Sequence, residues 1–359
     1  MLSTQTEREP RLMNYHGALL PASYSDPVIE HDAVRNAAGL FDFSFRAKFT
    51  AKGSDRVRFL HSMVSNDVKG LTPGSGNYAT LLDVRGHILA DLYMYCEVDQ
   101  FVIDTDVDLI EKVLQTLSRY NIGGRVPLDR ADLSALSIQG PKARAILQSA
   151  LAVNLPGPEE FSHTSAELAG QAVKLVKAGS TGEEGYEIWV AGAELETIRN
   201  LLLERGMNEG LIPCGCQALE LLRIEAGVAE YGAELAEDTL PLEAGLMNAL
   251  SFNKGCYIGQ EIVERARSRG RVNWDLSGLI VEASEAPQAG EKVLNEGKEI
   301  GEITSACVSP SLGKTLAMAY LRKEVSEPGT KLALASGPAA FVTALPFYRR
   351  EMALHRNQL

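Results

Sequence analysis

Hydrophobic positions recur with two different periods along this chain, and their order indicates the class of fold. Apolar residues spaced as on one face of a helix occur in the segments 27–35, 54–66, 107–120, 142–151, 194–204 and 217–225. Strand-like runs lie between them, at 48–51, 78–82, 87–95, 101–103, 133–138, 173–177 and 186–190. After residue 273 only short strands follow, broken by Gly and Pro, which predicts a small closed β-barrel. The pattern therefore predicts an α+β protein that ends in a β-barrel.

The segment 78–95 predicts a hairpin whose turn is 83–86, and its second strand carries an unexpected carboxylate. Asp91 shares one face of this strand with Tyr93 and Tyr95, while apolar residues occupy the other face. A carboxylate in that position lies either at a sheet edge in water or inside a pocket. The sequence alone leaves both alternatives open.

A cysteine motif at 254–261 holds the densest candidate chemistry. Its members are Lys254, Gly255, Cys256, Tyr257, Gly259, Gln260 and Glu261. The run 260–267 is expected to form a helix, so the thiol should lie close to a helix N-terminus and two residues from a lysine. Both features favour the thiolate and predict a thiol pKa below the usual ~8.5. The alternative, a small buried side chain in a glycine-bounded turn, stays open here.

Composition and charge narrow the possible partners. The 359 residues include 47 Asp and Glu against 35 Lys and Arg, a net charge of −12, which disfavours nucleic acid as a partner. No apolar run is long enough to span a bilayer, and the N-terminal residues lack a signal-peptide core. Five scattered cysteines favour a reducing, cytoplasmic location. The spacing of Cys214 and Cys216 is too short for the usual zinc knuckle, so we expect no metal site.

Several motifs, in a fixed order from about residue 16 to 348, resemble the glycine-cleavage T-protein (GcvT) superfamily. They are the segments 26–44, 66–67, 138–143, 181–188, 222–227, 309–314 and 345–348. Within that superfamily the cysteine motif, followed by Arg265 and Arg269, resembles the YgfZ branch. Members of that branch are folate-binding proteins that support iron–sulfur enzymes, and the motif cysteine is implicated in that role.

The resemblance implies a GcvT-like fold of three domains around a central folate channel. It divides the chain into a discontinuous α+β domain (1–53 with 127–230), a ferredoxin-like domain (54–126), a connecting segment with the cysteine motif (231–274) and a barrel (275–359). It also implies tetrahydrofolate as the cofactor, held by Tyr78, Asp91, Glu187 and Arg223, with Asp91 and Cys256 as the catalytic residues.

These residue types suit a reduced folate. A carboxylate can accept hydrogen bonds from the amide–amidine edge of a pterin, and aromatic faces can pack its ring. Arg223 could pair with an anionic glutamyl tail. Two positions depart from the T-protein pattern: Ala90 replaces the first residue of a paired Asp-Asp, and Ser180 replaces a tyrosine.

From this resemblance we expect a cytoplasmic monomer that binds a reduced folate and supports the assembly or maintenance of iron–sulfur proteins through Cys256. Its expected partners are the folate and iron–sulfur proteins or their assembly factors, with neither nucleic acid nor membrane. The alternative is a folate-dependent aminomethyltransferase or another one-carbon transferase, which would need Asp91 beside the folate but no thiol. A scaffold that has lost the ligand is a third possibility, and a folate titration would separate it from the other two.

Overall fold

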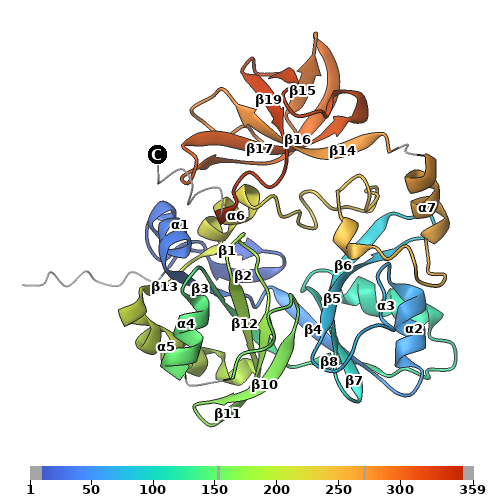
Figure 1. Ribbon diagram of the computed structural model, residues 1–359, viewed down its shortest axis with the longest axis vertical. Helices are drawn as coiled ribbons and strands as arrows, with labels where there is room; N and C mark the ends of the chain where they lie inside the picture. Colours follow the sequence, from blue (N-terminus) through green and yellow to red (C-terminus); the bar gives the residue numbers. More distant parts are fainter. Residues whose placement is uncertain (1–9, 152–153, 270–271, 351–359) are drawn as a thin grey trace, which may run out of the picture.

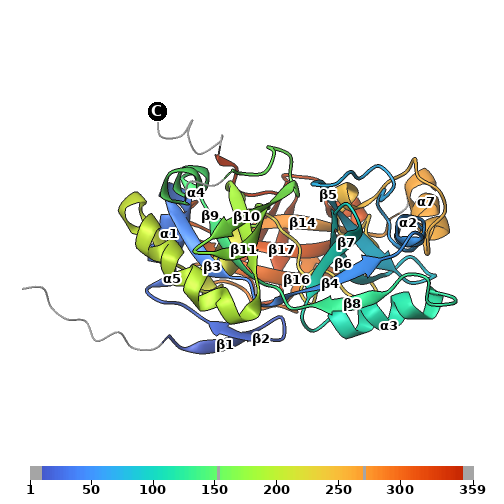
Figure 2. The same cartoon turned by 90° about the horizontal axis from the view of Figure 1, so that it is seen from below.

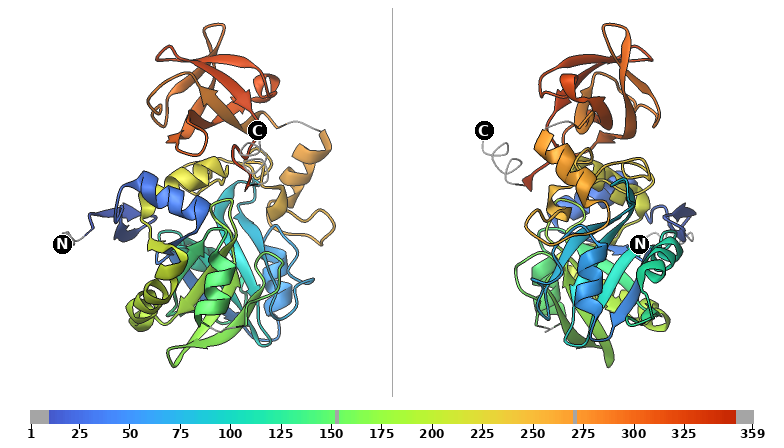
Figure 3. Two further views of the ribbon diagram at one scale, coloured as in Figure 1. Left: turned by 60° about the vertical axis from the view of Figure 1, so that its left-hand side comes forward. Right: turned by 90° about the vertical axis from the view of Figure 1, so that its right-hand side faces the viewer.

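Two helix-covered sheets lie side by side beneath a β-barrel (Figure 1). The computed structural model describes residues 10–151, 154–269 and 272–350. Figure 2 shows the two sheets from below, with the hairpin of β1 (Leu12–Tyr15) and β2 (Ala18–Pro21) along their lower rim. The barrel stands above both sheets in the side views of Figure 3. The predicted α+β class with a C-terminal barrel is confirmed. Among the described residues, no helix has the length and hydropathy needed to cross a bilayer.

The larger sheet has six strands in the order β10-β11-β12-β9-β3-β13. Apolar side chains of its inner strands alternate between two cores, one of them shared with α4 and α5 and the other turned towards the smaller sheet. β13 runs parallel to β3, and the remaining neighbours are antiparallel. The strands are β3 (Ala38–Asp42), β9 (Ser134–Gln139), β10 (His163–Leu168), β11 (Gln171–Lys177), β12 (Gly185–Val190) and β13 (Leu211–Pro213). The helical elements around it are α1 (Pro27–Asn36), α4 (Ala143–Leu151), η1 (Gly192–Glu194), α5 (Leu195–Gly206), η2 (Met207–Glu209) and α6 (Cys216–Glu225).

The smaller sheet is an antiparallel meander with an added pair of strands, in the order β5-β6-β7-β4-β8. One of its faces forms an apolar core with α2 and α3. The strands are β4 (Arg46–Lys52), β5 (Gly76–Leu82), β6 (Ile88–Cys96), β7 (Gln100–Asp106) and β8 (Leu128–Ala131). The helices are α2 (Arg56–Met63) and α3 (Ile110–Tyr120).

The C-terminal unit is a closed six-stranded barrel, in the order β14-β17-β16-β15-β18-β19, around its own apolar core. Its elements are β14 (Trp274–Val281), β15 (Lys292–Asn295), β16 (Lys298–Ser309), β17 (Lys314–Arg322), η4 (Lys323–Val325), β18 (Lys331–Leu334) and β19 (Ala339–Thr343). A connecting segment reaches it from α6 by way of η3 (Met247–Ala249) and α7 (Gln260–Arg269).

The strands of the smaller sheet extend beyond the boundaries expected for the smaller domain. β4 begins at Arg46 and β8 at Leu128, and both pair within the smaller sheet, although the expected division left them with the larger domain. We therefore propose that the smaller domain extends from Phe45 to Asp132. The hydrophobic pattern also missed β1, β2, β3, β8, β10 and β13, most of which are too short for alternation to be distinctive.

A buried carboxylate at the end of α6 joins α1 to the barrel. Glu225 Oε2 lies 2.9 Å from His31 Nε2 and accepts hydrogen bonds from Arg35 Nη2 at 2.7 Å and Ser311 Oγ at 2.8 Å. Ser309 donates to the other oxygen. Burial raises the pKa of Glu225, but His31 and Arg35 outweigh it and lower this pKa to about 2. The carboxylate is therefore kept charged by partners from two separate parts of the chain.

Glu225→Gln is expected to lower the free energy of unfolding at pH 7 by roughly 3 kcal/mol, because a neutral amide removes one of the two buried carboxylates that pair with Arg35 and leaves this cation with Glu183. The pKa of Glu225 is lowered from 4.5 to about 2 on folding. This stabilisation is therefore present above pH 4.5 and is lost as the pH falls towards 2. Urea unfolding at pH 7 and pH 3 measures it, with the exposed Glu204→Gln as control. An equal loss at both pH values would contradict this role.

Candidate functional site

The face of β6 that carries Asp91 is turned towards the larger sheet. Leu92 and Met94 belong to the core beneath α2 and α3, whereas Tyr95 packs edge-on against Trp189 of β12, with ring centroids 4.7 Å apart. The predicted alternation of the two faces is confirmed. Asp91 is 6% exposed, so the alternative that places this carboxylate at a sheet edge in water is wrong.

Two cations of β4 lie opposite two carboxylates of β7. The strand register pairs Arg46 with Asp106 and Lys48 with Asp104. Arg46 donates to Asp104 Oδ1 at 2.6 Å and to Asp106 Oδ1 at 2.5 Å, and Lys48 Nζ lies 2.9 Å from Asp104 Oδ2. All four side chains are buried. The sequence analysis missed them, although charges two residues apart in both strands are a signal of one shared face.

Asp91 lies beside this cluster with an oxygen unused. Among the described residues, its Oδ1 is buried and has no hydrogen-bond partner. Burial raises the pKa of Asp91 to about 6, against the opposing effect of Arg46 and with further repulsion from Asp106. A carboxylate with a free oxygen and a pKa near neutrality can accept a hydrogen bond from a ligand or hold a proton there.

Glu187 and Tyr78 reach the same neighbourhood from different sheets. Glu187 on β12 accepts a hydrogen bond from Trp189 Nε1 at 2.7 Å, and burial raises the pKa of this carboxyl. Tyr78 on β5 packs on Tyr93, with ring centroids 4.9 Å apart. Burial raises the pKa of Tyr93, and the charges of Asp91 and Glu187 raise it further. The structure thus brings three of the predicted site residues together around one tyrosine.

Arg223, the fourth predicted folate residue, is engaged with protein groups. Its Nε lies 3.1 Å from Glu230 Oε2, and its Nη1 donates to Glu234 Oε2 at 3.1 Å. Its Nη2 donates to Glu220 Oε1 at 2.6 Å and to Ser305 Oγ of the barrel at 2.8 Å. This guanidinium therefore joins α6 to the connecting segment and the barrel, and contact with an anionic ligand stays a prediction.

A histidine that was not predicted connects the ion pairs of Arg223 with those of Arg46. His16, in the turn between β1 and β2, lies with Nε2 3.1 Å from Glu230 Oε2 and Nδ1 3.2 Å from Asp106 Oδ2. Since Asp106 also accepts from Arg46 and Glu230 also pairs with Arg223, a continuous series of ion pairs runs from β4 through the N-terminal hairpin to α6. The sequence offered no signal for this contact, because His16 is far from both partners along the chain.

The cysteine motif is anchored by its lysine. Lys254 Nζ donates to the carbonyl oxygens of His61, Val64 and Asn66 at 2.6, 2.6 and 2.7 Å. Its charge is therefore directed at the C-terminal end of α2, where the helix dipole favours a cation, and not at the thiol as expected. Cys256 is exposed, so the buried alternative is wrong, and α7 begins four residues later, at Gln260.

Glycine is required in this motif because two turns meet there. Gly259 has a φ of +83°, and a Cβ at this position would lie 2.7 Å from the carbonyl oxygen of Asp83 and 3.0 Å from Gly86. The motif is thus docked on the turn between β5 and β6. Gln260 Oε1 accepts from the amide of Tyr257 at 3.3 Å, which stabilises the start of α7. These contacts give the motif a structural role whatever its cysteine does.

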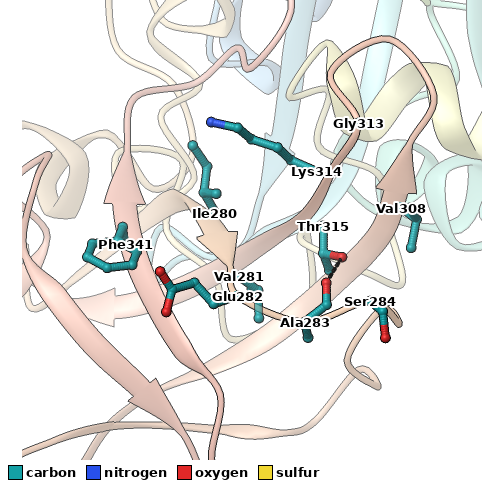
Figure 4. A pocket seen from close by; sticks show the side chains of 10 residues that line it. All are labelled: Ile280, Val281, Glu282, Ala283, Ser284, Val308, Gly313, Lys314, Thr315 and Phe341. Atoms are coloured by element: carbon teal, nitrogen blue, oxygen red, sulfur yellow. Dashed lines mark hydrogen bonds between the residues drawn. The ribbon is translucent and has the colours of Figure 1, made fainter.

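A separate pocket of about 530 Å³ opens on the barrel (Figure 4). Strands β14, β16, β17 and β19 supply much of its lining, and Thr315 Oγ1 donates to the carbonyl oxygen of Ala283 at 2.6 Å. Among its lining residues, none belongs to the group around Asp91 or to the cysteine motif. The barrel pocket is therefore distinct from the candidate site.

Comparison with known proteins places this geometry in a family context. Residues 1–254 match the model of the GCVT N-terminal domain, and residues 275–349 match that of the glycine cleavage T-protein C-terminal barrel domain. The aminomethyltransferase of Nostoc sp. is 34% identical over 358 residues, covering 96% of this chain and 93% of that protein. The aminomethyltransferase of Bacillus subtilis is 32% identical, with 95% and 96% covered. A solved structure, glycine cleavage system aminomethyltransferase T from Bartonella henselae, matches with a TM-score of 0.86 and 26% identity over 95% of both chains.

Asp91→Asn is expected to stabilise the protein without ligand by roughly 2–3 kcal/mol above pH 7, because it removes a buried charge that burial disfavours. The pKa of Asp91 is raised from 3.8 to about 6 on folding. The stabilisation that its proton supplies is present below pH 3.8 and is lost as the pH rises through 6, so the gain of the variant should grow across that interval. Urea unfolding from pH 4 to pH 8 measures it. A destabilised variant at pH 8 would show that the ionised carboxylate is well compensated.

Cys256 is expected to be alkylated faster at pH 7 than the other four cysteines. Its thiol is exposed, whereas the others are buried, and burial raises the pKa of each of those thiols. Mass spectrometry of iodoacetamide-treated protein gives the five rates, and Cys256→Ser should remove the fast phase. Equal rates at a buried position would show that exposure does not control reactivity here.

Proposed function

This chain belongs to the glycine cleavage T-protein family, and on that premise we propose that it is a folate-dependent aminomethyltransferase, which moves the methylene carbon of a carrier-bound aminomethyl group onto a reduced folate and releases the amino nitrogen as ammonia and the carrier in its free form. Relatives that cover nearly the whole chain carry that name, so these comparisons favour this alternative over the iron–sulfur role.

The observation that carries the proposal is the unpartnered, buried Oδ1 of Asp91. A buried carboxylate without a hydrogen-bond donor is costly unless a ligand supplies one. The amide–amidine edge of a reduced pterin offers N–H donors of this kind, and Tyr78 and Tyr93 offer paired ring faces beside it. The residues present therefore fit a reduced folate.

Each side chain then has a separable role in binding and proton control. A bound reduced folate would supply the nitrogen atoms, one in the pterin ring and one beside it, that take up the carbon. Arg46, held by two carboxylates, fixes the position of charge beside Asp91. Above pH 6 the Asp91 carboxylate is ionised and can orient an N–H group or balance positive charge that develops on the transferred carbon. Glu187 and Tyr78 lie near Tyr93, where they would contact the same ligand, and Arg223 holds the barrel against α6.

A thiol-dependent role is the second candidate, because Cys256 is exposed at the surface on a motif that is rigidly anchored. The comparisons give no support to iron–sulfur partners, and the exposed thiol is the structural feature that favours them. The two functions make different demands, since methylene transfer needs Asp91 and iron–sulfur maintenance needs Cys256.

Asp91→Asn should weaken the binding of tetrahydrofolate by about 1–3 kcal/mol, the usual cost of losing one charged hydrogen-bond partner in a buried site. Isothermal titration calorimetry measures this loss. In the wild type, affinity and turnover should rise with an apparent pKa near 6 as Asp91 ionises, and this rise should be absent from Asp91→Asn. Unchanged affinity in the variant would remove Asp91 from the folate site.

Cys256→Ser is the matched control for this experiment. If the protein is an aminomethyltransferase, this variant keeps tetrahydrofolate affinity and turnover. Loss of turnover in Cys256→Ser with retained turnover in Asp91→Asn would reject the proposal in favour of the thiol-dependent role.

A further inference from the structure

The N-terminal hairpin inserts one charged side chain between the larger units of the protein. His16 has a φ of 46°, in the left-handed region that histidine visits more readily than most residues. This conformation leaves its ring edge-on to Tyr15, at 4.5 Å between centroids, and 5.6 Å from Phe45. The side chain is 14% exposed, so the hairpin covers the ring from solvent.

The contacts of this ring require a positive charge. Nδ1 and Nε2 each lie within 3.2 Å of a carboxylate oxygen, on Asp106 and Glu230 respectively. A neutral imidazole has one N–H and one lone pair, whereas the imidazolium has two N–H donors. Two ionised carboxylates accept and cannot donate, so only the protonated ring satisfies both. Burial lowers the pKa of His16, but the two carboxylates outweigh it and raise this pKa to about 10.

We propose that His16 is a positioning residue of the candidate site: its positive charge neutralises Asp106 and thereby keeps Asp91 ionised at neutral pH. The inference rests on the proposed function, because it assigns to the hairpin the control of the carboxylate that the folate would meet.

The path of this effect is short and passes through shared partners. Asp106 uses one oxygen for Arg46 and the other for His16. β7 runs beside β6, and Thr105, the neighbour of Asp106, donates to the carbonyl oxygen of Asp91 at 3.1 Å. At this short range Asp106 repels the charge of Asp91, and Arg46 attracts it. Without the imidazolium, the negative charge of Asp106 would act on Asp91 with no positive charge of His16 to offset it, and Arg46 would remain as the cation that binds Asp106. The pKa of Asp91 would then rise, and at neutral pH a larger fraction would hold a proton where a ligand N–H must bind.

His16 is the cation that balances the charge of Asp106 on the side of the site that faces the N-terminal hairpin. The titratable or charged groups that face it are Asp106 of β7, Glu230 shortly after the end of α6, Tyr15 of β1 and, beside the following Gly17, Asp108. Arg223 acts on the far side of Glu230, and Tyr15 donates to the other oxygen of Glu230 at 2.8 Å. Asp91 itself is influenced by Arg46, Asp106 and Asp104.

The test measures the titration of Asp91 in the protein without ligand. Carbon-13 NMR of carboxyl-labelled aspartate follows each side chain, and Asp91→Asn assigns the signal. His16→Asn removes the charge while tolerating the left-handed backbone, and His16→Lys retains the charge. Leu19→Ser, an exposed position of the same hairpin, is the control.

We expect His16→Asn to raise the pKa of Asp91 by about one unit, the size of effect that one nearby charge has in a buried network. His16→Lys should return it towards the wild-type value, and Leu19→Ser should leave it unchanged. The pH at which the affinity for tetrahydrofolate rises, as Asp91 loses its proton, should increase by the same amount. An unchanged Asp91 titration in His16→Asn, or no recovery in His16→Lys, would overturn the proposal.

A measurement on the wild type guards against variants that do not fold. Nitrogen-15 NMR should show both ring nitrogens of His16 protonated at pH 8.5, and a neutral ring at that pH would overturn the inference. The proposed function fails separately, if the wild type does not bind tetrahydrofolate while Asp91 still responds to His16 as described.

Discussion

The contact between Arg46 and the two carboxylates of β7 is the constraint on which the site depends. Strand register places Arg46 opposite Asp106 and Lys48 opposite Asp104, and a slip of one residue would turn both cations to the other face. That face is the apolar core beneath α2 and α3, where a charge would have no partner. The same guanidinium lies over Tyr93, 4.9 Å from the ring centroid, so it also fixes the aromatic part of the site.

The local charge balance explains why this region suits a ligand better than it suits a closed core. Around the cations Arg46 and Lys48 lie the carboxylates Asp91, Asp104 and Glu187, and Asp106 adds a fourth. Burial raises the pKa of both Asp91 and Glu187, which shows that the protein does not fully compensate them. Such incomplete compensation lowers stability, and it is typical of groups that await a proton or a hydrogen-bond donor from a ligand.

The arrangement of the three units depends on α6. Arg223 donates to Ser305, and Glu225 accepts from Ser309. Two charged residues of one helical turn therefore form hydrogen bonds with the same barrel strand, β16. Glu225 also holds α1, and Arg223 reaches the hairpin through Glu230 and His16. Because each ion pair has partners from distant segments, the candidate site exists only when the units are assembled.

The sequence by itself determined the class of fold, the barrel, the two faces of β6 and the family resemblance, because each of these follows from local periodicity or from short motifs. It also singled out Tyr78, Asp91 and Glu187, which the structure brings to one neighbourhood. It could not decide whether Asp91 was buried or whether Cys256 was exposed, since both depend on which other element covers the residue. Lys254 shows the same limit: its sequence neighbour is a thiol, yet its ammonium binds the end of α2. Only the tertiary structure revealed His16 and Glu230, because ion pairs between segments that are distant in sequence leave no periodic trace in it. The alternating charges that include Arg46 were a local signal, but their partners became clear only from the strand register.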